Sequence, residues 1–480
     1  MISINNFING EFVPPNSNQY LDVYEPATGL IYSNVADSNS NDIENAYQSA
    51  QSAFKFWSGI SVEERAGYLN KIADGIESRL DEFAEYESRD PGKPISLAKS
   101  VDIPRAVSNF RFFAEFGLAF QFESELNSDQ SQNKLIRSPL GVVGCISPWN
   151  LPIYLFTWKI APALIAGNTV VAKPSEITPY TAFKLSEICR DAGFPVGVLN
   201  IIHGQGSTAG DALVGHRGIK AISFTGGTAT GKLITKKTAS SFKKLSLEMG
   251  GKNPAVIFAD CDYDNMLETM VRSSFSNQGQ ICLCSSRILV EESIYEKFKI
   301  DFVQRVSELK IGDPSKEGTQ FGALSSKGHY EKVLSYMEIA KQEGGKVLVG
   351  GNQIKINERC ETGWFVEPTI IEGLKNSCRT NQEEIFGPIV TLQSIQSEYE
   401  AIQLANETEY GLSATIWTED KEKANRVSSQ IDAGIIWVNC WLVRDLRTPF
   451  GGMKQSGMGR EGGDEALRFF TEPKNICTTQ

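Results

Sequence analysis

One cysteine of this 480-residue chain stands in a setting that suits nucleophilic chemistry. Cys282 follows the polar, glycine-containing stretch 276–280, at an expected junction between a helix and a loop. A thiolate is a good covalent nucleophile near neutral pH when it is partly exposed and electrostatically supported. A free cysteine is more often buried and inert, so the residue type alone leaves both roles open.

Two further residues have the side chains that carbonyl chemistry needs. Glu248 ends an expected strand and runs into two glycines, where a carboxylate can act as a general base. Asn150 follows an expected buried strand at 141–146 and offers an amide that can stabilise an oxyanion. Taken singly, each has an ordinary alternative: a solvated surface glutamate, and an asparagine that forms a turn before Pro152.

The stretch 224–232 combines a strand, a glycine turn and the start of a helix. Such a turn suits phosphate binding at a helix N-terminus. Gly226, Gly231 and Lys232 match the spacing of a P-loop, but Leu233 stands where a magnesium-binding Ser or Thr is required. We therefore discount a nucleoside-triphosphate site, and the glycine turn by itself stays weak evidence.

The elements that would position these residues alternate between strand and helix. This alternation predicts right-handed βαβ units and an open parallel sheet, with ligands at the carboxyl ends of the strands. Asn150, the glycine turn and Glu248 should therefore meet at one edge. The expected strands are 141–146, 169–172, 198–202, 221–224 and 244–247, and the expected helices are 161–166, 180–192, 208–214 and 231–240.

The remaining segments complete two α/β lobes with a cleft between them. Residues 1–35 indicate short strands and turns, and 42–87 and 95–120 have helical apolar spacing. A second α/β set follows Gly250. Its expected strands are 255–258, 287–290, 435–440 and runs near 347, 369, 390 and 414, with helices at 266–274 and 295–309.

Composition excludes several classes of protein. With 41% hydrophobic and 22% charged residues, the chain is typical of a globular protein. A net charge of −11 argues against nucleic-acid and anionic-membrane partners. No apolar run reaches the ~18 residues of a membrane span, and residues 1–13 lack a secretory signal. Nine cysteines and three scattered histidines without metal-ligand spacing indicate reduced thiols, a cytoplasmic location and no metal.

Taken together, the motifs resemble the NAD(P)-dependent aldehyde dehydrogenases over essentially the whole chain. They occur in order as Pro148-Trp149-Asn150, Lys173-Pro174-Ser175-Glu176, Phe224-Thr225-Gly226, Leu247-Glu248-Met249-Gly250-Gly251-Lys252, Gly279-Gln280-Ile281-Cys282, Glu384-Ile385-Phe386-Gly387-Pro388 and Pro449-Phe450-Gly451-Gly452. The motifs taken together are specific to this family, whereas each motif alone is not.

The resemblance implies an aldehyde dehydrogenase-like α/β fold with a small β oligomerisation arm. The implied Rossmann-type NAD-binding domain is 1–121 with 140–249, the α/β catalytic domain is 250–450, the arm is 122–139 with 463–480, and 451–462 is a return segment. An edge strand paired across subunits would cover unpaired backbone groups, so a homodimer or homotetramer is expected.

The same resemblance implies the roles of three residues. Cys282 attacks the aldehyde carbon, and the Asn150 amide and the Cys282 backbone N–H hold the oxyanion. Hydride transfer to nicotinamide then leaves a thioester, which water activated by Glu248 hydrolyses. The presence of Glu248 favours hydrolysis over transfer to coenzyme A.

The resemblance also implies a set of cofactor-binding residues. Lys173 and Glu176 should contact the adenosine ribose, where a carboxylate favours NAD over NADP. Glu384 should hold the nicotinamide ribose with Phe386 packed nearby, and Gly227 replaces a usual serine. The full set is Ile146, Ser147, Trp149, Lys173, Ser175, Glu176, Phe224, Thr225, Gly226, Gly227, Glu384 and Phe386.

The expected substrate channel differs from that of many relatives. Arg105 and Arg444 stand where apolar or aromatic residues are common, and Ser276 also replaces an aromatic. Two guanidinium groups favour a carboxylate at the far end of the substrate, unless they pair with Asp102 and Asp445 instead. The apolar walls are expected to be Leu151, Tyr154, Leu155, Trp158 and Phe450.

Within the family, segments 102–105 and 439–445 look like the 2-aminomuconic and 2-hydroxymuconic semialdehyde dehydrogenases. These oxidise a conjugated, carboxylated aldehyde in tryptophan (kynurenine) or aromatic-ring catabolism. One alternative is the same chemistry on another aldehyde, such as a non-aromatic dicarboxylic semialdehyde. Another is a non-catalytic binding protein on this scaffold, against which the intact Cys282, Glu248 and Asn150 argue.

Overall fold

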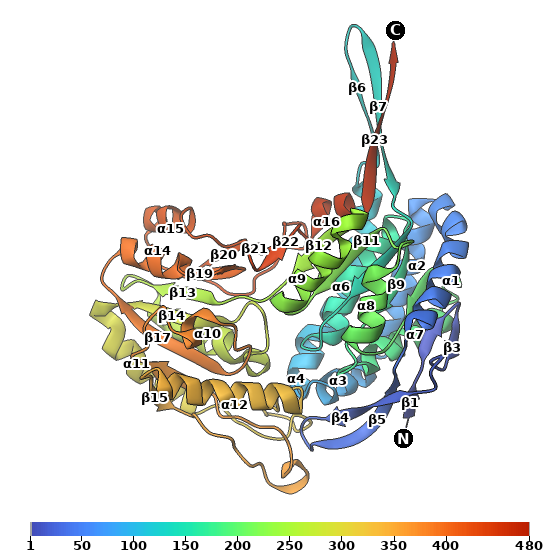
Figure 1. The fold of residues 1–480 in the computed structure, drawn as a ribbon. Helices are drawn as coiled ribbons and strands as arrows, with labels where there is room; N and C mark the ends of the chain where they lie inside the picture. The colour runs from blue at the N-terminus through green and yellow to red at the C-terminus, as the bar shows by residue number, and fades with distance from the viewer. Residues whose placement is uncertain (1, 480) are drawn as a thin grey trace.

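The computed structural model describes residues 2–479 as two α/β lobes and a projecting arm (Figure 1). Elements of the first half of the chain form one lobe, at the right of the view, and the elements from β13 to β20, residues 253–438, form the other. The predicted α/β class is confirmed. No helix within residues 2–479 is long and apolar enough to cross a membrane.

The first lobe is built on an eight-stranded sheet whose central strands run parallel. In spatial order the strands are β22 (Gly457–Met458), β12 (Lys244–Glu248), β11 (Ala221–Thr225), β8 (Val142–Ile146), β9 (Thr169–Lys173), β10 (Leu199–Ile201), β2 (Asn6–Ile8) and β3 (Glu11–Val13). Ile146 pairs with Lys173, and Thr225 pairs with Glu248. The carboxyl ends of these strands therefore lie at one edge, as the motif positions predicted.

Helices of the first lobe differ from the prediction at two places. The stretch 42–87 forms three helices instead of one, because Ser61 and Glu64 make a capping box that starts a new helix. The helix predicted at 161–166 begins earlier, at Pro152. The helices are α1 (Ser40–Gly59), α2 (Val62–Ser78), α3 (Leu80–Arg89), α4 (Ile95–Leu97) with the π-turn η1 (Ala98–Asp102), α5 (Ile103–Ala119), α6 (Pro152–Ile165), α7 (Tyr180–Asp191), α8 (Asp211–Gly215) and α9 (Thr228–Thr238).

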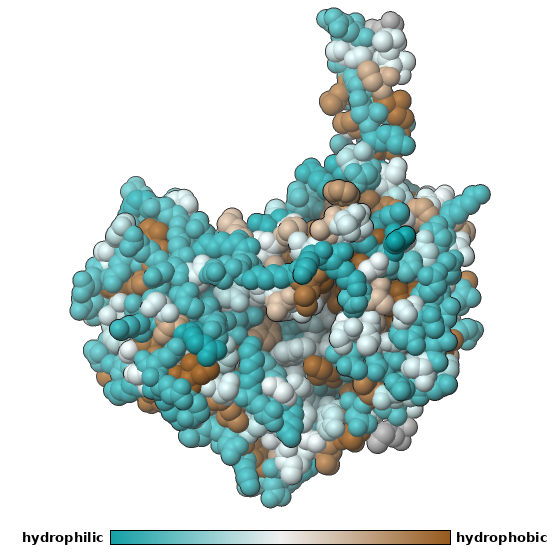
Figure 2. All heavy atoms as spheres, viewed as in Figure 1, coloured by the Kyte–Doolittle hydropathy of each residue, from teal (hydrophilic) through white to brown (hydrophobic). Residues whose placement is uncertain are grey.

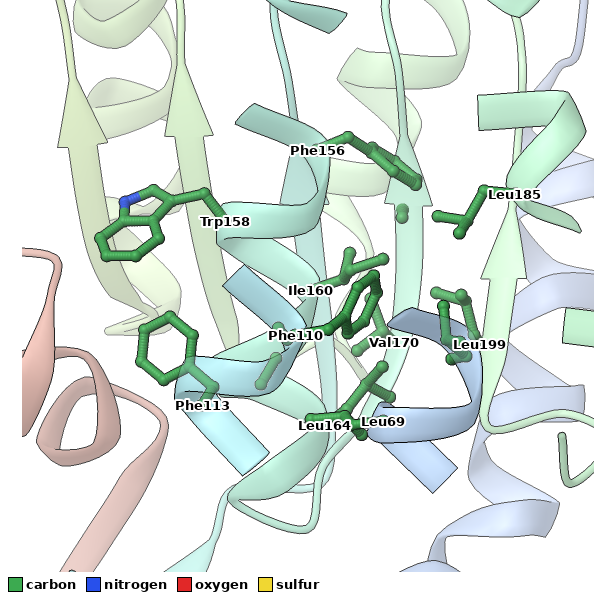
Figure 3. Packing of buried hydrophobic residues seen from close by; sticks show 14 of the residues in the cluster. Leu69, Phe110, Phe113, Phe156, Trp158, Ile160, Leu164, Val170, Leu185 and Leu199 are labelled. Atoms are coloured by element: carbon green, nitrogen blue, oxygen red, sulfur yellow. The ribbon is translucent and has the colours of Figure 1, made fainter. Parts of the chain in front are cut away.

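Helix α6 lies at the centre of this lobe. All 14 of its residues are buried, so it has no polar stripe, and a period-based reading could not recognise its full length. Proline at its start is favourable, because the first turn has no intrahelical partner for the missing N–H. Figure 3 shows how Phe156, Trp158, Ile160 and Leu164 of α6 pack against neighbouring elements; the neighbours are Leu69, Phe110, Phe113, Val170, Leu185 and Leu199.

The second lobe contains a seven-stranded sheet. Its strands are, in spatial order, β15 (Lys346–Val349), β16 (Thr369–Glu372), β17 (Ile389–Ile395), β14 (Ser285–Glu291), β13 (Asn253–Ile257), β19 (Ser413–Trp417) and β20 (Ile435–Val438). Its helices are α10 (Tyr263–Phe275), α11 (Glu292–Ser307), α12 (Lys327–Gln342), α13 (Arg379–Gln382), α14 (Glu398–Asn406) and α15 (Lys421–Ser428). The predicted strands are all present, but α12, α14 and α15 were not predicted.

Small elements join the lobes to one another. A three-stranded sheet near the N-terminus contains β1 (Ile2–Ile4), β5 (Leu30–Ala36) and β4 (Tyr20–Glu25). A two-stranded ladder pairs β18 (Tyr410–Gly411) with β21 (Met453–Lys454). Because β22 follows β21 and pairs with β12, the chain returns from the second lobe to the first sheet after residue 452.

The arm is a three-stranded antiparallel sheet that stands away from both lobes (Figures 1 and 2). Its strands are β6 (Glu123–Asn127), β7 (Ser131–Pro139) and β23 (Thr471–Thr479). Helix α16 (Gly463–Phe469) precedes β23 and packs on α5 and α6, so only the later part of the segment 463–480 lies in the arm. Apolar side chains such as Leu126 and Ile476 are exposed on it.

Candidate active site

An inner cavity of about 350 Å³ is lined by residues of both lobes, and Cys282 and Glu248 both line it. Six of the eight residues predicted to bind substrate also line it: Leu151, Tyr154, Leu155, Ser276, Arg444 and Phe450. The lining residues that were not predicted are Leu97, Val101, Asp102, Met249, Arg272, Ile281, Leu283, Trp441, Leu442, Val443 and Glu461.

An outer groove of about 720 Å³ follows the carboxyl edge of the first sheet. Ten of the twelve predicted cofactor residues line it: Ile146, Ser147, Trp149, Lys173, Ser175, Glu176, Phe224, Thr225, Gly226 and Gly227. The other two, Glu384 and Phe386, line a separate small cavity of about 20 Å³.

Cys282 lies where the inner cavity and the small cavity meet. Thr225 lines both the outer groove and the inner cavity, so the two adjoin. Cys282 and Ile281 line both the inner cavity and the small cavity that contains Glu384 and Phe386. A thiol in this position can react with a molecule bound in the inner cavity. A second molecule bound in the groove can extend toward the thiol past Thr225.

The loop before Cys282 is held in an unusual backbone conformation. Asn277 and Gln278 have φ of 50° and 57°, in the left-handed region that non-glycine residues rarely adopt. Asn150 Nδ2 donates to the Gln280 carbonyl at 2.8 Å. Asn253 Nδ2 donates to the Cys282 carbonyl at 2.6 Å. These buried hydrogen bonds stabilise a strained turn, which is common where a reactive group must be aimed.

The side-chain amide of Asn150 can donate a second hydrogen bond. An amide nitrogen carries two hydrogens, and the contact with the Gln280 carbonyl uses one of them. The backbone carbonyl of Asn150 accepts from Asn277 Nδ2 at 3.0 Å, so both the side chain and the backbone of this residue are fixed. The remaining N–H leaves open the oxyanion contact that the sequence predicted, and Asn150 itself is not among the residues that line the inner cavity.

Burial suppresses the charged forms of both reactive groups. Burial, followed by the nearby Glu384 and Glu248 carboxylates, raises the pKa of the Cys282 thiol, while Arg444 opposes this rise. Burial and the Glu461 charge raise the pKa of Glu248 well above its ordinary value, against the effects of Lys159 and Arg460. Neither Glu248 carboxylate oxygen has a hydrogen-bond partner in the described chain, so both can bind water or a proton.

Arg444 is held between two aromatic rings. Its guanidinium lies 4.0 Å from the centre of the Phe450 ring and 4.9 Å from that of Trp158. Asp445, the alternative partner, is paired with Arg447 instead. Arg444 Nη2 is buried and has no hydrogen-bond partner among residues 2–479. The cavity therefore contains a cation with an unsatisfied donor, which a carboxylate would satisfy.

Arg105 and Trp158 lie behind the cavity wall. The Arg105 guanidinium is 5.5 Å from the centre of the Tyr154 ring, and Tyr154 itself lines the cavity. Asp102, its suggested partner, makes a buried ion pair with Lys93 at 2.9 Å. Neither Arg105 nor Trp158 is among the residues that line the inner cavity. Arg105 therefore acts on the cavity through Tyr154 in this structure.

Arg272 is a second guanidinium of the inner cavity, and sequence reasoning missed it. It lies in the last turn of α10, and the described residues include no ion-pair partner for it. Ser276 follows it by four residues, so the two positions share one helix face. That spacing was a usable signal. Leu283 and Trp441 also line the cavity, but no sequence pattern indicated this.

The outer groove fits a dinucleotide. Ser147 and Thr225 line it with buried hydroxyls that have no partner in the described protein. A Cβ on Gly226 would lie 2.5 Å from the Phe224 ring, whereas one on Gly227 would meet open space. Gly226 is thus required sterically, and the usual serine would fit at Gly227.

The two ends of the cofactor set carry carboxylates. Lys173 Nζ pairs with Glu176 Oε2 at 3.1 Å in the groove. Glu384 Oε1 accepts from the Gly251 backbone N–H at 3.0 Å. A Cβ on Gly250 would lie only 2.0 Å from Glu384 Oε2, and one on Gly251 would lie 2.5 Å from Asn253 Oδ1, so each glycine leaves room for a polar side chain. Within residues 2–479 no group of three or more His, Cys, Asp and Glu residues could hold a metal ion.

Comparisons with known proteins agree with this geometry. The profile described as "Aldehyde dehydrogenase family" matches residues 12–476. The 2-aminomuconic semialdehyde dehydrogenase of Danio rerio is 50% identical, covering 98% of this chain and 97% of that protein. The 2-hydroxymuconic semialdehyde dehydrogenase of Pseudomonas sp. (strain CF600) is 46% identical, covering 99% of each. A crystal structure of betaine aldehyde dehydrogenase from Staphylococcus aureus in complex with NAD+ has a TM-score of 0.96 at 37% identity, covering 99% of this chain and 94% of that one.

Proposed function

Because this chain belongs to the aldehyde dehydrogenase family, we propose that it oxidises a carboxylated semialdehyde to the dicarboxylic acid with NAD as cofactor. Its activity is NAD-dependent aldehyde oxidation, EC 1.2.1.-. The substrates we favour are 2-aminomuconate and 2-hydroxymuconate 6-semialdehyde. The observation that carries the aldehyde chemistry is that Cys282 and Glu248 line one cavity, which adjoins the outer groove at Thr225.

The reaction follows from the side chains at the junction. Cys282 gives its proton to a water molecule and attacks the aldehyde carbon, while the free N–H of Asn150 and the Cys282 backbone N–H stabilise the oxyanion. Loss of hydride from the adduct leaves a thioester on Cys282, and NAD held by the groove lining would supply the hydride acceptor. Glu248 then takes a proton from the water that attacks the thioester on Cys282, and the thiol is regenerated.

Burial and nearby charges control the protonation of the Cys282 thiol. Burial and neighbouring carboxylates raise the pKa of Cys282, so the thiol form dominates before ligands bind. The nearby Arg444 charge opposes this rise, and so does any positive charge added beside the thiol. A protected thiol limits oxidation of the free enzyme, since the thiolate is the reactive form.

The unsatisfied guanidinium of Arg444 supports the substrate class. A carboxylate at the far end of the substrate would accept charge-assisted hydrogen bonds from Arg444, which lines the same cavity as Cys282. The relatives described above act on such aldehydes by name. A second candidate, a non-aromatic dicarboxylic semialdehyde, uses the same Arg444 contact.

The test is NADH formation from 2-hydroxymuconate semialdehyde, with benzaldehyde as the uncharged control. We expect Arg444→Ala to lower kcat/KM for the semialdehyde by about tenfold or more and to lower it for benzaldehyde much less, since only the semialdehyde loses a direct contact. Arg105→Ala tests the contact through Tyr154. If neither variant differs from wild type, or if benzaldehyde is oxidised as well as the semialdehyde, the carboxylate assignment is wrong. Adipate semialdehyde separates the second candidate, because it lacks the conjugated double bonds.

The arm supports an assembly of several copies. Three strands with exposed apolar residues and no covering layer are marginal by themselves, so we propose that a second copy covers them in a homodimer or homotetramer. We also propose the division into a cofactor domain (1–121, 140–249), a catalytic domain (250–450) and an arm given above. Nine free thiols support a reducing compartment, the cytoplasm.

A further inference from the structure

Helix α12 contacts the cofactor end of the active site at two points. His329 Nε2 lies 2.7 Å from the Phe386 carbonyl oxygen. One turn later, Lys332 Nζ donates to the Glu384 carbonyl at 3.0 Å. The loop that carries Glu384 and Phe386 is thus attached to α12 on both sides of Ile385. No motif of the sequence pointed to α12, and the aldehyde chemistry above does not use it.

Phe386 needs such an attachment. Its φ of 62° lies in the left-handed region, which is unfavourable for a bulky residue. A carbonyl oxygen can only accept a hydrogen bond, so the His329 ring carries its hydrogen on Nε2. Burial, followed by the Lys332 charge, lowers the pKa of His329 to about 4, which keeps the ring neutral near pH 7. A neutral donor thus holds the strained carbonyl in place.

The same ring also joins the two spaces that a dinucleotide must cross. His329 packs against Trp149 with ring centres 4.9 Å apart, and Trp149 meets Phe386 edge to face at 5.4 Å. Trp149 lines the outer groove, whereas Phe386 lines the small cavity beside Cys282. These three rings therefore connect the lining of the groove to the lining of the small cavity beside Cys282.

The start of α12 is also tied to the nucleophile loop. Ser326 caps the helix by accepting from the His329 backbone N–H at 3.2 Å. The preceding Ser325 donates its backbone N–H to Gln280 Oε1 at 3.1 Å. Because Gln280 is two residues from Cys282, one helix end sets the relative position of the cofactor loop and the nucleophile loop.

We propose that His329 is a positioning residue that holds Phe386 against Trp149 and so fixes the nicotinamide half of the cofactor beside Cys282. The proposal rests on the cofactor roles proposed above for Glu384 and Phe386. It assigns to His329 no contact with the reacting atoms.

The experiment compares His329→Leu, His329→Gln and the control Glu331→Gln, an exposed position on the same helix. Three quantities are measured on the full-length protein: NAD affinity by calorimetry, kcat and KM in NADH formation, and the rate at which iodoacetamide alkylates Cys282 without NAD. We expect His329→Leu to weaken NAD binding about tenfold and to lower kcat, with the KM for aldehyde unchanged. His329→Gln keeps an N–H donor and should recover most of the loss.

Several outcomes would overturn the proposal. Equal NAD affinity and kcat in wild type and His329→Leu would show that the ring positions nothing. A glutamine variant as poor as the leucine variant would exclude the hydrogen bond as the cause. A parallel change in the alkylation rate of Cys282 would show general disruption of the site. Failure of wild type itself to bind NAD would instead refute the proposed function, so the two are distinguishable.

Discussion

Ten residues of the outer groove lie at or just after the ends of neighbouring strands in one sheet, and turns and helices α8 and α9 complete it. The inner cavity takes most of its lining from helices and loops of both lobes. The groove is lined by glycines, hydroxyls and a Lys–Glu pair, and the cavity by aromatic and aliphatic side chains around Arg444. A shared sheet edge fixes the groove through backbone register. The cavity depends on how separate elements pack, so it can change its substrate without disturbing the groove.

The largest expected effect comes from replacing Cys282, which should abolish catalysis in the cavity and leave cofactor binding in the groove intact. Cys282→Ala removes the nucleophile, and we expect kcat for aldehyde oxidation to fall by about four orders of magnitude or more. NAD affinity should stay within about twofold of wild type, because the groove lining is unchanged. Steady-state NADH formation and calorimetry measure the two effects. Residual activity near that of wild type would contradict the covalent mechanism.

Glu248→Gln should separate the two halves of the reaction. It removes the base but keeps the size of the side chain, and we expect thioester hydrolysis to slow by about 10²–10⁴-fold. The first turnover should survive as a burst of NADH in stopped-flow measurements. Glu422→Gln, on the exposed start of α15, is the matched control. Absence of a burst together with slow turnover would assign Glu248 to an earlier step.

Glu176→Gln should change the groove and leave the cavity as it is. Glu176 is paired with Lys173, and its charge repels a 2′-phosphate on the adenosine ribose. Without that charge, the free Lys173 can pair with the phosphate, and we expect the ratio of kcat/KM for NADP to that for NAD to rise by about tenfold. The KM for aldehyde is the internal control and should not move. An unchanged ratio would place the ribose elsewhere.

Arg272→Met should change the cavity and leave the groove as it is. Arg272 is exposed at the end of α10 and lines the cavity, so its charge attracts an anionic substrate through solvent. We expect the KM for a carboxylated aldehyde to rise by about threefold at low ionic strength and much less at 0.5 M salt, since salt screens exposed charges. Benzaldehyde kinetics should not respond. A salt-independent effect would indicate a direct contact instead.

The smallest expected effect concerns pH. Glu248 acts as a base only when ionised, so hydrolysis should increase as pH rises through its pKa, which burial and the Glu461 charge raise. Glu461→Gln removes the second cause, and the midpoint of the pH–rate profile should move to lower pH. Single-turnover hydrolysis between pH 5 and 9 measures this shift. A midpoint that moves upward would show that Glu461 supports the ionised base.

Short sequence patterns predicted most of the strands and several of the helices. The strands that end at Lys173 and Glu248 were predicted to within one residue because buried strands have a clear apolar run bounded by turn residues. Helix α6 was shortened because its uniform burial removes the amphipathic period. Helices α12, α14 and α15 were missed although Ser326, Ser397 and Asp420 cap them.

The sequence by itself determined the reaction class, because motif order specifies a nucleophile, a base and a dinucleotide groove whose residues share one sheet edge. Only the tertiary structure decided which cations enter the inner cavity: Arg444 and Arg272 line it, and Arg105 lies behind Tyr154. Only the tertiary structure places His329 within hydrogen-bond distance of Phe386, 57 positions further along the chain. Register between adjacent strands follows from local patterns, whereas contacts between distant helices and loops depend on the packing of the whole molecule.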